Sequence, residues 1–84
     1  MSDHDLHQRV IDIVRRVLRI ESIDPAADFF DLGASSMELL QIVELVEAEC
    51  ARSASVIDIF EAADVDSFAR IVAEAEPVGP LARE

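Results

Sequence analysis

Apolar residues recur along the chain at the spacing of amphipathic helices. In the first segment they fall three or four residues apart, so they share one helix face: Leu6, Val10, Ile13, Val14, Val17 and Leu18. Ser2 or Asp3 can cap the start of this helix. Arginines crowd its last turns, where cations complement the helix dipole. A first amphipathic helix is therefore predicted across this segment.

The second predicted helix runs from about Ser36 to Cys50. Its inward-facing residues are Leu39, Ile42, Val43, Val46 and Cys50. The preceding stretch, Glu21 to Ser35, lacks a sustained helical period and contains Pro25 and Gly33. We therefore expect a long loop here, and long loops inside compact domains are often functional. Its expected anchors into the core are Ile23, Phe29, Phe30 and Leu32.

Two shorter helices complete the predicted fold. The third covers roughly Val56 to Ala63 and has Ser55 as its expected cap. Ile57 and Phe60 are its expected contacts with the core. The fourth follows Asp64 and turns these residues inward: Val65, Phe68, Ile71 and Val72. Because strand patterns are absent, the fold class is all-α, a four-helix bundle with a short third helix.

Chain length and composition support one small folded domain. The chain has 84 residues, and 51% of them are hydrophobic, which argues against intrinsic disorder. We assign the domain to residues 1–76. The remaining residues, 77–84, contain two prolines and a glycine and are expected to form a flexible tail.

Charge and cysteine content exclude several functional classes. The net charge of −11 should repel nucleic acid and anionic membranes and attract basic partners. The single cysteine, Cys50, cannot form an internal disulfide and is expected to be a small core residue. No Cys/His spacing indicates a metal site, and no apolar run suits a signal or membrane span. We expect a soluble, cytoplasmic monomer.

Two adjacent serines, Ser35 and Ser36, stand at the predicted start of the second helix. Either one can cap the helix by accepting a hydrogen bond from an otherwise unpaired N–H. A hydrolase elbow, G-x-S-x-G, is excluded because no glycine follows either serine and no strand precedes them. His4 and His7 lie among polar residues of the first helix, without the partners of a catalytic triad. We therefore predict no catalytic residue.

The stretch "FFDLGASSMELLQIVELVE" resembles the phosphopantetheine attachment region of acyl and peptidyl carrier proteins. Their signature is an acidic residue, a variable residue, Gly, two more residues, and the modified Ser followed by Leu or Met. Asp31, Gly33, Ser36 and Met37 occupy these positions. Downstream, "VIDIFEAADVDSFARIVAE" looks like the third and fourth helices of carriers from polyketide and nonribosomal peptide assembly lines. The resemblance covers roughly residues 5–75.

The resemblance implies a function for Ser36. This serine would hold covalent 4′-phosphopantetheine, whose thiol carries an acyl, aminoacyl or peptidyl intermediate as a thioester. The implied partners are a phosphopantetheinyl transferase, a loading enzyme (adenylating enzyme or acyltransferase), and ketosynthase, condensation or tailoring enzymes. The chain itself would catalyse nothing. The pattern does not distinguish acyl from aminoacyl cargo, and the start at Met1 suggests a freestanding carrier.

The residue before Ser36 departs from the family pattern. Many carriers have Asp immediately before the modified serine, whereas this chain has Ser35. The difference disfavours a housekeeping fatty-acid carrier, and it makes Ser35 the better candidate for the cap. Gly33 would permit both a special backbone conformation and a close approach that a side chain would obstruct.

A second face of the Ser36–Cys50 helix carries Met37, Leu40, Glu44 and Glu47. Exposed apolar residues flanked by carboxylates suit docking to a hydrophobic groove with a basic rim. Alternatively, Leu40 packs under a neighbouring loop and the glutamates are merely solvated. A different functional class also stays open, an unmodified acidic helical adaptor that binds a basic partner through this helix.

Overall fold

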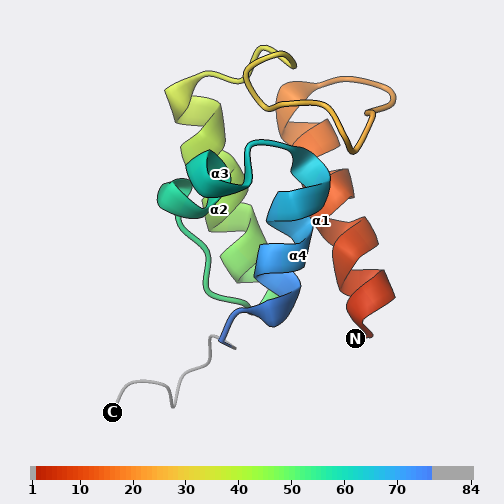
Figure 1. Cartoon of the computed structure of the whole chain (residues 1–84), viewed down its shortest axis with the longest axis vertical. Helices are drawn as coiled ribbons and strands as arrows, with labels where there is room; N and C mark the ends of the chain where they lie inside the picture. The colour runs from red at the N-terminus through yellow and green to blue at the C-terminus, as the bar shows by residue number, and fades with distance from the viewer. Residues whose placement is uncertain (1, 77–84) are drawn as a thin grey trace.

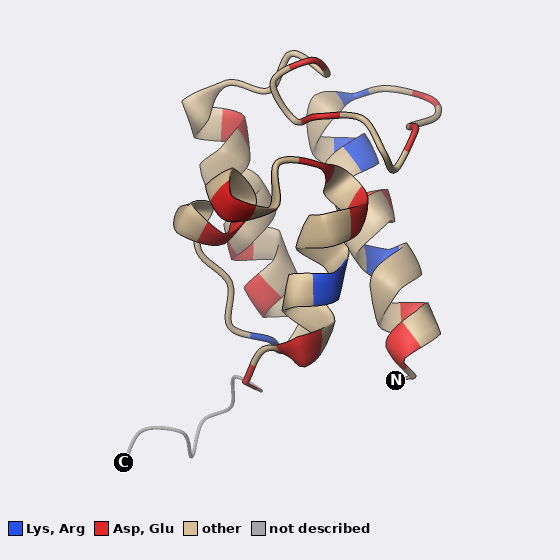
Figure 2. Ribbon diagram, viewed as in Figure 1, with Lys and Arg blue, Asp and Glu red and all other residues tan. Residues whose placement is uncertain are grey.

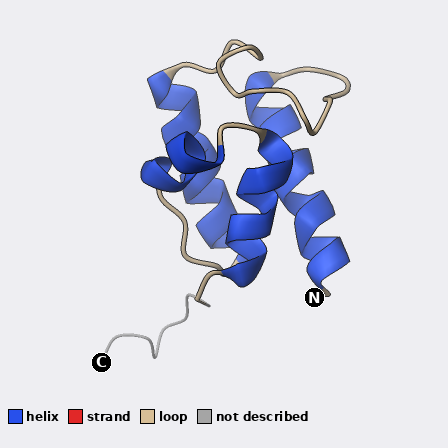
Figure 3. Cartoon of the chain, in the orientation of Figure 1, coloured by secondary structure: helices blue, strands red, loops and turns tan. Residues whose placement is uncertain are grey.

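The computed structural model describes residues 2–76 and contains four helices in this range: α1 (Asp3–Leu18), α2 (Ser36–Cys50), α3 (Val56–Ala62) and α4 (Val65–Glu74). α1 runs antiparallel to α2 and α4, and the short α3 lies between α2 and α4 (Figure 1). The described residues form no strand (Figure 3), and an isolated antiparallel bridge joins Asp28 to Asp64. The predicted all-α class is confirmed. The expected flexible tail, residues 77–84, lies outside the described residues.

Each helix begins at a polar side chain that accepts a backbone hydrogen bond from three residues further on. The caps are Ser2, Ser35, Ser55 and Asp64. Such caps satisfy one of the N–H groups that a helix start leaves without a partner. Of the two candidates for the α1 cap, Ser2 and Asp3, the structure shows Ser2, and the predicted α3 cap, Ser55, is confirmed.

The hydrophobic core lies where α1 packs against both α2 and α4. It contains Leu6, Val10, Ile13, Val14, Phe29, Leu39, Ile42, Val43, Val46, Cys50, Ala54, Ile59, Val65, Phe68, Ala69 and Val72. Phe29, from the α1–α2 loop, meets Phe68 of α4 edge to face, with ring centroids 5.8 Å apart. The inward stripe predicted for α2 is buried throughout. Cys50 is part of this core, and its burial raises the pKa of the thiol.

Four predicted core contacts are wrong. The exposed fractions are 55% for Phe30, 66% for Ile57 and 56% for Phe60, whereas Ile59 is 1% exposed and anchors α3. Apolar residues occur three positions apart on more than one face of this seven-residue helix, and such a short pattern does not reveal which face points inward. On α4, Ala69 is buried and Ile71 is only partly buried. Ile23 and Leu32 do pack against the core, as predicted.

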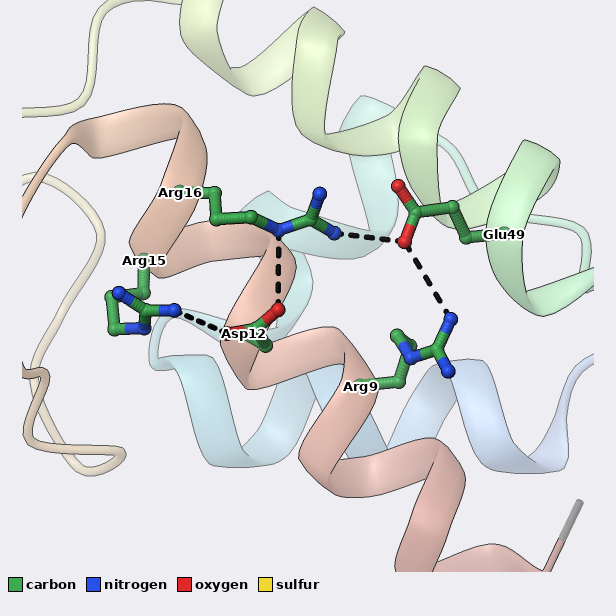
Figure 4. A network of polar contacts seen from close by, with 5 residues as sticks. All are labelled: Arg9, Asp12, Arg15, Arg16 and Glu49. Atoms are coloured by element: carbon green, nitrogen blue, oxygen red, sulfur yellow. Dashed lines mark hydrogen bonds and ion pairs between the residues drawn. The ribbon is translucent and has the colours of Figure 1, made fainter.

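Charged side chains connect α1 to its neighbours. Arg9 and Arg16 of α1 both pair with Glu49 of α2, at N–O distances of 3.7 and 2.8 Å (Figure 4). Asp12 pairs with Arg15 and Arg16 on the same helix, and the hydrogen bond from Arg15 is the main cause that lowers the pKa of Asp12. Acidic residues occur on all four helices and in the loops, whereas three of the arginines, Arg9, Arg15 and Arg16, lie on α1 (Figure 2).

Candidate functional site

The long α1–α2 loop is held against the start of α4 by backbone hydrogen bonds. The Phe29 N–H donates to the Ala63 carbonyl at 3.1 Å, and the Val65 N–H donates to the Ala27 carbonyl at 3.3 Å. The Asp66 N–H donates to the Pro25 carbonyl at 2.8 Å. These bonds, together with the buried Phe29 ring, give a segment without regular secondary structure a defined position.

The last part of this loop is a compact turn that leads into α2. The Gly33 N–H donates to the Phe30 carbonyl at 3.0 Å, and the Ala34 N–H donates to the Phe29 carbonyl at 3.2 Å. Gly33 has a φ of +84°, a conformation that disfavours residues with a side chain. A Cβ at this position would meet nothing within 4 Å. The positive φ therefore favours glycine at this position, whereas the expected close approach of another group is not found among residues 2–76.

Ser35 and Ser36 have different surroundings at the start of α2. The Ser35 hydroxyl accepts the Glu38 N–H at 3.3 Å, and the Glu38 carboxylate accepts the Ser35 N–H at 2.9 Å. This reciprocal arrangement is a capping box, so the assignment of Ser35 as the cap is confirmed. Ser36 is the first residue of α2; its side chain is exposed and makes no hydrogen bond to another described residue.

The other residues of the attachment motif are also exposed. Asp31 lies on the surface of the turn, and the Met37 side chain is 64% exposed beside Ser36. The arrangement therefore presents one hydroxyl at a helix N-terminus, where the N–H groups of Ser36 and Met37 have no partner among residues 2–76. Such N–H groups and the positive end of the helix dipole favour a bound phosphate group.

The proposed docking strip, which consists of Met37, Leu40, Glu44 and Glu47, is accessible along most of α2. Leu40 is 46% exposed, and Glu44 has its carboxylate on the surface without a hydrogen bond to a described residue. Glu47 is different, because its carboxylate accepts the Ala54 N–H of the α2–α3 connection at 3.2 Å. Glu47 therefore stabilises the chain locally, whereas Glu44 has no such role.

Sequence reasoning missed the exposed aromatic surface beside the loop. The rings of Phe30 and Phe60 stack on each other with centroids 5.7 Å apart and planes inclined by 21°. Their pairing joins the turn before Ser36 to α3. The sequence predicts both residues to be in the core, and no sequence signal distinguishes the buried Phe29 from its exposed neighbour Phe30.

Comparison with known proteins identifies the family. The sequence pattern of the family described as "Phosphopantetheine attachment site" matches residues 8–72 of this chain. The chain belongs to this family. The family carries covalently attached 4′-phosphopantetheine. The exposed Ser36 hydroxyl and the adjacent open N–H groups fit this group, so the described residues agree with the family's chemistry.

One relative matches most of this chain in sequence. The chain is 33% identical to surfactin synthase subunit 1 of Bacillus subtilis over 69 residues, which are 82% of this chain and 2% of that protein. The chain thus corresponds to a small part of that relative. Carrier domains of this family interact in general with biosynthetic enzymes and with a phosphopantetheinyl transferase.

Two solved structures share the fold of this carrier domain. A type-II acyl carrier protein from Streptomyces verticillus, BlmI, involved in bleomycin biosynthesis, aligns with a TM-score of 0.77 at 24% identity, covering 83% of this chain and 84% of that one. A nonribosomal PCP domain aligns with a TM-score of 0.72 at 24% identity, covering 94% and 95%. Among residues 2–76, no helix has the length and hydrophobicity needed to cross a membrane.

Proposed function

We propose that Ser36 is the attachment point of 4′-phosphopantetheine and that this carrier domain transfers acyl or aminoacyl/peptidyl intermediates between enzymes of a polyketide or nonribosomal peptide pathway. One observation carries the assignment to Ser36. Its hydroxyl is exposed at the start of α2, whereas the Ser35 hydroxyl is already the helix cap. The two serines therefore differ in availability, although they are adjacent in the sequence.

The residues around Ser36 support this role in distinct ways. The Ser36 hydroxyl would be the nucleophile that a phosphopantetheinyl transferase uses, and the open N–H groups of Ser36 and Met37 would favour the resulting phosphodiester. When bound, the group supplies a terminal thiol that holds the cargo as a thioester. The chain contributes tethering, which raises the effective concentration of the cargo at each partner enzyme.

Partner recognition is proposed to use the docking strip of α2, Met37, Leu40, Glu44 and Glu47. Exposed apolar side chains beside carboxylates complement a hydrophobic groove with basic residues at its rim. The partners would be the transferase, a loading enzyme (adenylating enzyme or acyltransferase), and ketosynthase, condensation or tailoring enzymes. The relatives named for surfactin and bleomycin synthesis favour secondary metabolism as the setting.

Intact-mass measurement tests the proposal directly. The purified chain is incubated with coenzyme A and a broad-specificity phosphopantetheinyl transferase, beside the variants Ser36→Ala and Ser35→Ala. We expect a mass gain of one phosphopantetheine group in the unaltered chain and in Ser35→Ala, and no gain in Ser36→Ala. No gain in any sample would favour the unmodified acidic adaptor. A gain that survives Ser36→Ala would refute the assignment to this serine.

A further inference from the structure

The connection between α3 and α4 contains a strained backbone conformation. Ala63 has φ 71° and ψ −47°, and the Asp64 N–H donates to the Ala62 carbonyl at 2.8 Å. These features define a γ-turn with a positive φ at its central residue, which is a rare and strained form for a residue with a side chain. Such conformations persist where the surrounding structure fixes them, and they occur often in switch regions.

Contacts with the α1–α2 loop fix this turn. The Ala63 carbonyl accepts the Phe29 N–H at 3.1 Å. On the inner side Phe29 contacts Phe68, and on the outer side Phe30 stacks on Phe60 of α3. The strained residue thus lies between two aromatic contacts that join the same loop to α4 and to α3.

The same loop residues define the turn that leads to Ser36. The carbonyls of Phe29 and Phe30 accept the N–H groups of Ala34 and Gly33, at 3.2 and 3.0 Å. α3 is seven residues long, fully buries only Ile59, and has Val56 and Ala62 partly buried against the core. It packs against α2 and α4 but not against α1 within residues 2–76. A change in α3 therefore has a short route of hydrogen bonds and ring contacts to the turn before Ser36.

We propose that α3 and the turn before Ser36 form one coupled conformational unit, closed by the Phe30–Phe60 stack and the Phe29–Ala63 hydrogen bond. Strain at Ala63 favours opening of the unit, and the two contacts oppose it. A partner surface that competes for Phe60 would release the turn that precedes Ser36. This last consequence rests on the proposed carrier function, whereas the coupling itself is a property of the unmodified chain.

Amide hydrogen exchange, followed by NMR on the full unmodified chain, tests the coupling. In Phe60→Ala we expect the amides of Phe29, Gly33 and Ala34 to exchange roughly threefold to tenfold faster, because an aromatic pair is lost. Ile57→Ala is the matched control, since Ile57 is exposed on the same helix and outside the stack. In Ile57→Ala, the amides of Phe29, Gly33 and Ala34 should exchange as fast as in the unaltered chain. Equal rates in the two variants would overturn the proposal.

Two further variants separate coupling from general loosening. Ala63→Gly should slow exchange of the Phe29 amide severalfold, because glycine adopts a positive φ without strain and so stabilises the closed unit. Faster exchange in this variant would overturn the assignment of strain. Phe30→Ala should reproduce the effect of Phe60→Ala, and the double variant should add nothing; additive effects would show that the rings act independently. None of these results depends on whether Ser36 is modified.

Discussion

Ser35 and Glu38 cap each other at the start of α2, each donating its backbone N–H to the side chain of the other, at 2.9 and 3.3 Å. Two donors that a helix start normally leaves without partners are thereby satisfied. The capping box uses the first of the two serine hydroxyls and leaves the second, on Ser36, exposed. Ser35 therefore stabilises the helix start, and the Ser36 hydroxyl is left for the attachment that we propose.

The two serines should respond differently to removal of the hydroxyl. Ser35→Ala should lower the free energy of unfolding by about 0.5–2 kcal/mol, the usual cost of a lost cap, and should keep the cofactor. Ser36→Ala should leave stability near that of the unaltered chain, because the Ser36 hydroxyl bonds to no described residue. Denaturant unfolding measures both values. A larger loss in Ser36→Ala than in Ser35→Ala would contradict the assignment of the cap.

Ser35→Asp extends this test toward the commoner family residue. Aspartate can accept the same N–H and places a negative charge at a helix N-terminus, where the dipole favours it. We expect unchanged or higher stability and normal modification by mass. If Ser35→Ala lost modification while Ser36→Ala kept it, the roles of the two serines would be reversed.

Charge reversal on α2 should weaken encounter with partner enzymes. Glu44→Arg is the cleaner variant, because Glu47 also accepts the Ala54 N–H and its replacement would perturb the α2–α3 connection. We expect a slower rate of modification by the transferase at low salt and a smaller effect at high salt, since exposed charge attraction is screened. Glu74→Arg, near the end of α4, makes the same change in net charge away from α2. Equal rates for the two variants would exclude Glu44 from docking.

Local patterns predicted α2 well because several signals agree there. A stripe of apolar residues, a capping serine and a glycine in the preceding turn all define the same start, and the expected Ser36–Cys50 helix matches the observed one. The proposal for Ser36 and its neighbours comes instead from the resemblance of this stretch to carrier proteins. The sequence favours Ser35 as the cap, and the structure shows the capping hydrogen bond, which leaves the Ser36 hydroxyl exposed.

Tertiary contacts explain what the sequence did not predict. The sequence predicts that the third helix continues to Ala63, but in the structure Ala63 is the central residue of a γ-turn. The Ala63 carbonyl accepts the N–H of Phe29, which is far away in the chain. Likewise, Phe29 is buried against Phe68 while Phe30 stacks on Phe60 at the surface. Neighbouring phenylalanines in a loop have no period that would assign one to the core.

Substitution of the buried stripe of α2 tests its orientation. Leu39→Ala and Val43→Ala should each lower the free energy of unfolding by roughly 1–4 kcal/mol, because both remove buried methyl groups and leave a cavity. Ile57→Ala, at an exposed position, should change stability far less. Thermal or denaturant unfolding gives the three values. If Leu39→Ala and Val43→Ala lowered the free energy of unfolding as little as an exposed substitution does, the helix would be rotated relative to the structure.

Acid should destabilise the start of α4 through Asp64. The Asp64 carboxylate accepts the Ser67 N–H at 2.7 Å, and this hydrogen bond is the main cause that lowers the pKa of Asp64 below its usual 3.8. A carboxyl group with a lowered pKa in the folded state stabilises the fold above 3.8, and the contribution is lost as the pH falls through the folded-state value. Asparagine can accept the same N–H but does not titrate.

The variant Asp64→Asn should therefore have nearly unchanged stability at neutral pH and a shallower loss of stability below pH 3.8. Urea unfolding at a series of pH values measures the difference between the two curves. Asp31→Asn is the matched control, because the exposed Asp31 carboxylate accepts no hydrogen bond from a described residue. If Asp31→Asn reduced the loss of stability at low pH as much as Asp64→Asn did, this loss would come from overall charge. The α4 cap would then contribute nothing specific to acid stability.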